Sequence, residues 1–131
     1  MATRSRPLSP HLQVYRRTHT MVLSILHRAT GLVLALGLLL FAVWLLALAA
    51  GPSAYTQLTR RLISLPGRLL LVGFVLAFCY HFTSGVRHLV FDTGRGLERR
   101  AARHSAVLVV VVSLLLAALS LWAMLRSGGS P

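Results

Sequence analysis

The side chains best suited to chemistry are histidines, and one of them shares a helix face with a glycine and a second histidine. His81, Gly85 and His88 are spaced at i, i+4 and i+7, so in a helix they lie within about 60° of one another. A neutral imidazole is a good metal ligand, and a glycine lets a flat ligand approach the backbone closely. The stripe predicts a metal-centred ligand at His81. The alternatives are a histidine hydrogen-bonded between helices and tight helix packing at Gly85.

A second polar group lies earlier in the chain, where Ser24, His27 and Arg28 are spaced at i, i+3 and i+4 and so share one helix face. Together they offer a hydroxyl, a titratable donor and a permanent charge with five donors. An interfacial anchor would explain Arg28 alone, but it does not explain the triplet. We interpret this face as a polar binding face at the inner membrane interface.

Other side chains receive plainer interpretations. Arg87 points about 120° away from His81 around a helix, so we interpret it as a headgroup anchor. Cys79 is the only cysteine, which excludes a disulfide scaffold; it is interpreted as a small buried hydrophobe. Trp44 and Trp122 lie near the ends of apolar runs and are interpreted as interfacial belt residues.

These residues lie in a chain dominated by three uncharged apolar runs, 29–50, 69–86 and 105–125. Of the 131 residues, 56% are hydrophobic and 12% charged, against about 25% charged in a soluble domain. This composition excludes most soluble enzymes. The formal charge of +12 comes from arginines at the ends of the runs, where they would meet lipid headgroups, so no nucleic-acid partner is expected.

We therefore predict an all-α integral membrane protein with three transmembrane helices, part of a heteromeric bundle. The predicted boundaries are a cytoplasmic segment 1–20, spans 21–50, 69–91 and 105–126, an external loop 51–68, a cytoplasmic loop 92–104 and an external tail 127–131. With the N-terminus inside, ten arginines lie on the inner side and four outside, which fits a cytoplasmic N-terminus. Neither a signal peptide nor a transit peptide is expected, which favours a bacterial inner membrane.

Ligation of a haem by two histidines needs two imidazoles at similar depth on opposing helices. His81 is the one histidine expected at membrane depth, because His27 and His88 are expected near the inner surface and His104 precedes the third span. A haem at His81 would therefore take its second ligand from a second copy or a different subunit.

Three stretches of the chain carry a family resemblance. Residues 6–15 (RPLSPHLQVY), 24–31 (SILHRATG) and 81–92 (HFTSGVRHLVFD) together resemble the cytochrome b membrane-anchor subunit of succinate dehydrogenase, respiratory complex II. The similarity spans the whole chain, with three helices in the family order. The S-x-x-H-R and H-x-x-x-G-x-R-H-L-x-x-D patterns are specific in combination.

The resemblance implies a role for each group of residues. His81 would be an axial ligand of haem b, Ser24 and Arg28 would border a quinone site, and His27, Arg28 and His88 would lie near the haem propionates. The implied partners are a flavoprotein, an iron–sulfur protein and a second small membrane subunit. The chain itself has one cysteine and no dinucleotide fingerprint, so succinate oxidation is expected elsewhere. The alternatives are a haem-free structural anchor and the anchor of a fumarate reductase.

Overall fold

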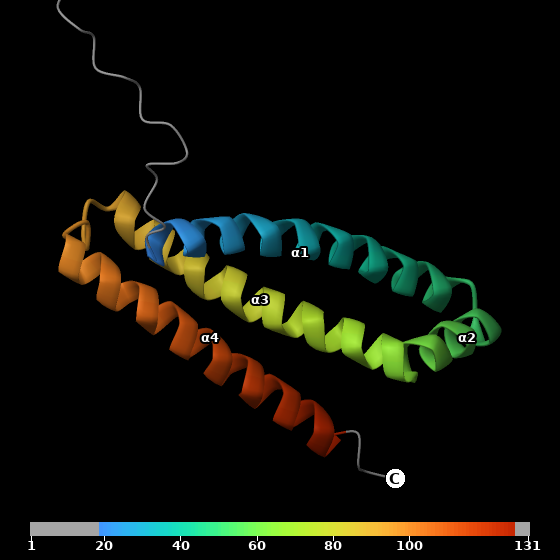
Figure 1. The fold of residues 1–131 in the computed structure, drawn as a ribbon. Helices are drawn as coiled ribbons and strands as arrows, with labels where there is room; N and C mark the ends of the chain where they lie inside the picture. The colour runs from blue at the N-terminus through green and yellow to red at the C-terminus, as the bar shows by residue number, and fades with distance from the viewer. Residues whose placement is uncertain (1–18, 128–131) are drawn as a thin grey trace, which may run out of the picture.

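The computed structural model describes the backbone of residues 19–127, and all of its regular structure is helical. The elements are α1 (His19–Ala49), α2 (Pro52–Ile63), α3 (Leu65–Asp92) and α4 (Arg99–Ser127), with no strand among these residues (Figure 1). The predicted all-α class is confirmed. Residues 1–18 and 128–131, which make up most of the predicted N-terminal segment and external tail, lie outside the described residues.

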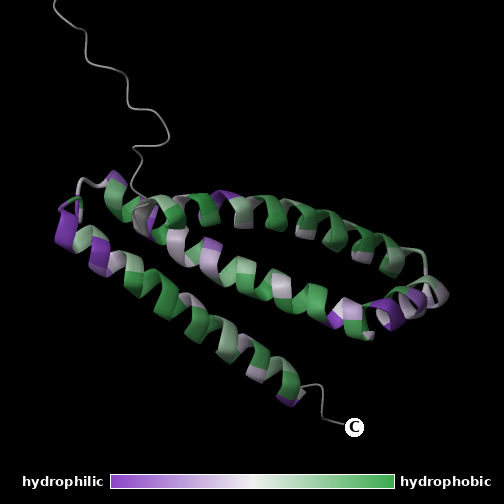
Figure 2. Ribbon diagram, viewed as in Figure 1, coloured by the Kyte–Doolittle hydropathy of each residue, from purple (hydrophilic) through white to green (hydrophobic). Residues whose placement is uncertain are grey.

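Three of the helices are long enough to cross a bilayer. α1, α3 and α4 contain 31, 28 and 29 residues, which is roughly 42 to 46 Å of helix against a hydrocarbon core of about 30 Å. The candidate spans are Met21–Ala49, Leu65–Asp92 and Arg99–Arg126. Figure 2 shows apolar residues over most of these helices and hydrophilic residues mainly toward their ends. The prediction of three helices long and apolar enough to cross a membrane is thereby confirmed.

The helices extend beyond the uncharged runs because arginine is a good helix former and can reach headgroups from inside a helix. α4 begins at Arg99, six residues before the expected start at Ser105. α3 begins at Leu65, ahead of the expected start at Leu69, with Pro66 in its first turn. A proline is tolerated there because the first backbone N–H groups of a helix have no partner within the helix.

The connection 51–68, predicted as a loop, contains the short helix α2. Gly51 has a φ of 104° and makes the turn out of α1, a conformation that side chains disfavour. Pro52 then starts α2, and Arg60 and Arg61 lie in its last turn, where positive charge is favourable. The proline and glycines indicated a loop, whereas the structure uses them to begin helices.

α3 lies between α1 and α4 and packs against both (Figure 1). Small residues fill the closest contacts; Ala77, Ala106 and Ala117 are among the few side chains with 5% exposure or less. Such residues allow helix backbones to approach closely in a bilayer. Most large apolar side chains face outward, with Leu32 68% exposed and Leu125 79%. This outer surface suits lipid tails or further helices rather than water.

Arg87 joins α3 to α4 and does not reach the headgroups. Its side chain is 8% exposed, with Nε donating to Ser105 Oγ at 2.9 Å and Nη2 donating to the Ala102 carbonyl at 3.1 Å. The guanidinium also lies 4.4 Å from the centroid of the Phe91 ring. The interpretation of Arg87 as a headgroup anchor is wrong, because the face of α3 that turns away from His81 meets α4 instead of lipid.

Candidate functional site

The antiparallel course of α1 and α3 brings the two sequence motifs to one end of the bundle. The start of α1, the end of α3 and the start of α4 meet there (Figure 1). The imidazole rings of His27 and His81 are stacked with centroids 4.0 Å apart and planes 8° apart. The ring of His88 lies 5.0 Å from that of His27, at an interplanar angle of 51°. Three histidines from two helices therefore form one cluster.

The expected difference in depth between His27 and His81 is wrong, because their rings are in contact. Position along the sequence suggested that His27 belongs nearer the membrane surface than His81. The helices pack so that His27 of α1 faces the segment of α3 between His81 and His88. Single-helix spacing carries no information on that alignment between helices.

His81 is held by a hydrogen bond that selects the tautomer of its neutral ring. Its Nδ1 lies 3.1 Å from the backbone carbonyl oxygen of His27. A carbonyl oxygen carries no hydrogen, so Nδ1 must be the donor. In the neutral imidazole, Nε2 then has no hydrogen and presents its lone pair, which is the state that binds a metal.

Gly85 is not required for the packing of α1 against α3. A Cβ built at Gly85 would have His27 Cε1 at 3.9 Å as its only neighbour within 4 Å, which is an ordinary contact. The packing alternative for this glycine therefore has little support within the chain. Gly85 is half-buried, and the His27 ring lies over it.

The donor set fits one side of a haem. His81 offers a single metal-binding nitrogen, and among the described residues no three histidine, cysteine or carboxylate side chains are arranged so that they could hold a metal ion together. A bare ion would therefore be poorly held. A haem brings four nitrogen ligands of its own and needs only axial ones. His27 Nδ1 is buried and has no hydrogen-bond partner within residues 19–127, and with His88 it could receive the acidic groups of such a ligand.

Ser24 and Arg28 lie on the first turns of α1, next to the cluster. Ser24 is half-buried and Arg28 is exposed, so a hydroxyl and a charge are available at the same end of the bundle as His27. The Tyr80 hydroxyl donates to the carbonyl of Leu23 at 2.9 Å and ties this part of α1 to α3. The sequence analysis did not assign Tyr80 a role; its hydroxyl within an apolar run, next to His81, was the available signal.

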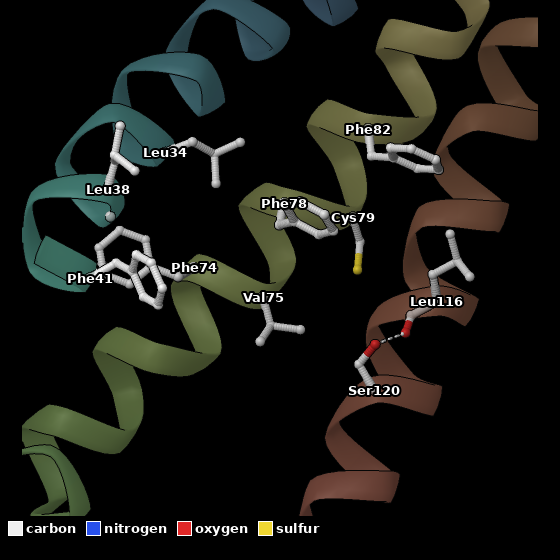
Figure 3. Close-up of a pocket in the computed structure, with 11 residues that line it drawn as sticks. Leu34, Leu38, Phe41, Phe74, Val75, Phe78, Cys79, Phe82, Leu116 and Ser120 are labelled. Atoms are coloured by element: carbon white, nitrogen blue, oxygen red, sulfur yellow. Dashed lines mark hydrogen bonds between the residues drawn. The ribbon is translucent and has the colours of Figure 1, made fainter. Parts of the chain in front are cut away.

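A separate apolar groove lies nearer the middle of the bundle. It has a volume of about 960 Å³ and is bordered by Phe74, Phe78 and Phe82 of α3 together with residues of α1 and α4 (Figure 3). The Ser120 hydroxyl at its border donates to the Leu116 carbonyl of its own helix at 2.8 Å. Because its lining is almost entirely apolar and contains no histidine or charged side chain, the groove suits an apolar chain.

The fold and the cluster define a multi-span membrane protein with a histidine-rich candidate site at one end of its helical bundle. Residues 2–120 match the family of the succinate dehydrogenase/fumarate reductase transmembrane subunit, and the chain belongs to this family. The family resemblance seen in the three sequence stretches is thereby confirmed.

Individual relatives agree with this membership. The chain is 40% identical over 117 residues to the succinate dehydrogenase cytochrome b556 subunit of Paracoccus denitrificans, covering 89% of this chain and 90% of the relative. The corresponding protein of Rickettsia typhi is 43% identical over the same length and coverage. The mitochondrial cytochrome b560 subunit of Homo sapiens is 37% identical over 113 residues, covering 85% and 67%. All three relatives are succinate dehydrogenase cytochrome b subunits.

Proposed function

We propose that this chain holds haem b through His81 and forms part of a quinone site with Ser24 and Arg28, while it anchors a succinate:quinone oxidoreductase. The observation that carries the proposal is the single cluster made by both motifs, in which His27 stacks on His81 and His81 presents Nε2 outward from its bond to the His27 carbonyl. When bound, haem b supplies a one-electron redox centre beside the quinone site.

The residues of this chain divide the work. His81 ligates the iron, and His27, Arg28 and His88 surround the propionates. Ser24 and Arg28 donate hydrogen bonds to a quinone carbonyl at the interface, where the quinone keeps its tail in lipid. Preorganised donors stabilise the negative charge that the carbonyl gains on reduction. The described residues hold no second histidine placed to ligate the same iron, so a second small membrane subunit supplies that ligand.

The proposed assembly also includes a flavoprotein and an iron–sulfur protein, which oxidise succinate and deliver electrons to the histidine end of the bundle. The chain itself carries no part of succinate oxidation. The proposed location is a bacterial inner membrane with a cytoplasmic N-terminus, supported by the arginine distribution. In this orientation Ser24, Arg28 and His88 face the side where the soluble subunits dock.

The visible spectrum of the purified, membrane-extracted complex tests the haem part of this proposal. The reduced-minus-oxidised spectrum should show the sharp bands of a low-spin haem with two histidine ligands, at one haem per copy of this chain. A complex that oxidises succinate and reduces quinone but shows no such bands would establish the haem-free anchor instead. A complex whose quinol:fumarate activity far exceeds its succinate:quinone activity would establish the fumarate reductase alternative.

A further inference from the structure

The side of His81 that faces α1 is contacted by Thr30 as well as by the His27 carbonyl. Thr30 Oγ1 lies 3.3 Å from His81 Nδ1. The same hydroxyl donates toward the carbonyl oxygens of Leu26 and His27, at 2.8 and 2.9 Å. A hydroxyl has one hydrogen, and the carbonyls, which are acceptors only, take it. Thr30 Oγ1 must therefore accept from His81 Nδ1–H, which is shared between Thr30 and the His27 carbonyl.

The backbone bond also fixes the Thr30 side chain. A threonine in a helix that bonds back to the carbonyls of the preceding turn is locked in one rotamer. This leaves the lone pairs of Oγ1 directed across the helix contact toward α3, where His81 Nδ1 meets them. The acceptor is thus in place before any ligand binds.

Gly31 gives the His81 ring its room against α1. A Cβ at this position would lie 3.1 Å from His81 Cε1 and 3.6 Å from Nδ1. The first distance is tighter than a normal carbon contact, so a methyl group at Gly31 would require the His81 ring to shift by a few tenths of an ångström. Thr30 and Gly31 are neighbours on α1. Thr30 provides a hydrogen-bond acceptor for the His81 ring, and Gly31 provides the space that the ring occupies.

We propose that Thr30 and Gly31 are positioning residues for the haem ligand, holding the His81 ring with Nδ1–H toward α1 and Nε2 toward the iron. The inference rests on the proposed function of His81. Acceptors on the far nitrogen of a metal-bound histidine fix its tautomer and raise its basicity. A more basic ligand stabilises the ferric iron, so removal of the Thr30 acceptor raises the midpoint potential of the haem.

The test uses three variants in the assembled complex. Thr30→Val keeps the shape of the side chain but removes the acceptor, Thr30→Ser keeps the hydroxyl, and Thr56→Val removes a hydroxyl that bonds only to Pro52 of its own exposed helix. Thr30→Val should raise the midpoint potential and speed haem transfer to a soluble haem-binding protein by about tenfold. Thr30→Ser and Thr56→Val should stay close to the parent protein.

The outcomes separate a positioning role from a packing role. An unchanged potential and transfer rate in Thr30→Val, or equal shifts in Thr30→Val and Thr30→Ser, would overturn the inference, because a structural effect follows side-chain shape rather than the acceptor. If His81→Leu keeps a normal haem spectrum, the proposed function itself fails. If His81→Leu loses the haem as expected but Thr30→Val leaves the midpoint potential and the haem transfer rate unchanged, only the inference about Thr30 fails.

Gly31→Ala tests the space independently. The added methyl should displace the His81 ring and alter the low-spin haem signal in electron paramagnetic resonance. Gly73→Ala on α3 is the matched control, since a Cβ there meets nothing within 4 Å. An unchanged signal in Gly31→Ala would contradict the role of Gly31. Succinate oxidation with a soluble dye identifies complexes that have failed to assemble. If Gly31→Ala fails in this way, the comparison of Thr30→Val with Thr30→Ser tests the positioning role instead.

Discussion

The ring of His27 lies face to face on the ring of His81, with centroids 4.0 Å apart and planes 8° apart. This contact unites two motifs that lie more than fifty positions apart in the chain. Ser24 and Arg28 lie on the same helix as His27 and within one turn of it, so both are close to the proposed iron ligand His81. A quinone bound at Ser24 would therefore lie close enough to exchange electrons with the haem.

Removing the Ser24 hydroxyl should slow quinone reduction selectively. Ser24→Ala leaves a carbonyl unpaired as it gains charge, a loss on the order of 1–3 kcal/mol, so succinate:quinone activity should fall by about tenfold or more. Succinate oxidation by a soluble artificial acceptor should be retained, because that route bypasses the membrane site. Ser120→Ala, which removes a hydroxyl bonded within α4, serves as the control. Retention of both activities in Ser24→Ala would place the quinone elsewhere.

Arg87→Leu should destabilise the anchor without touching the ligands directly. The change removes hydrogen bonds to Ser105 and to the Ala102 carbonyl and leaves both α4 acceptors facing an apolar side chain. The expected loss is about 2 kcal/mol, measured as a lower melting temperature of the purified complex. Arg126→Leu, at an exposed position on the far end of α4, should have a much smaller effect. Equal melting temperatures for the two variants would contradict the α3–α4 link.

The hydroxyl of Tyr80 should stabilise the contact between α3 and the start of α1. Tyr80→Phe removes the bond to the Leu23 carbonyl and the contact of the hydroxyl with Ser84, so we expect a loss of about 1 kcal/mol in thermal stability. Tyr55→Phe on α2 keeps its ring contact with Trp44 and is the matched control. A complex with Tyr80→Phe that melts at the same temperature as the parent protein and the Tyr55→Phe control would show that the bond contributes nothing to the assembly.

The orientation of the chain can be tested with single cysteines. A cysteine at Arg99 should react with a membrane-impermeant thiol reagent only from the cytoplasmic side, and a cysteine at Arg60 only from outside. The native Cys79 is 5% exposed and should stay silent in both. The opposite labelling pattern would place the histidine end of the bundle away from the soluble subunits and would contradict the proposed path of electrons.

The spans and the His81 stripe could be predicted because both depend on order along one helix. Uncharged length identifies a span, and an i, i+4, i+7 spacing places residues on one face whatever the helix packs against. The alignment and rotation of one helix against another are not encoded in that spacing. For this reason the depth of His27, the burial of Arg87 and the approach of Thr30 to His81 became visible only in the folded chain.

Helix α2 could not be predicted for a different reason. Pro52, Pro66 and their neighbouring glycines indicate breaks in regular structure, and each does lie at a break. The same residues are tolerated or favoured at the first turn of a helix. The polarity of the stretch after Pro52 is typical of a loop, but a polar stretch of this length can equally form a helix at the membrane interface.

The most direct test of the account is the reduced-minus-oxidised visible spectrum of the complex carrying His81→Leu, compared with His104→Leu. His104 is exposed at the start of α4 and takes no part in the cluster. The account predicts that His81→Leu loses or strongly alters the low-spin haem bands while succinate oxidation by a soluble dye persists, and that His104→Leu keeps the parent spectrum. An unchanged spectrum in His81→Leu would contradict the assignment of His81 as the iron ligand.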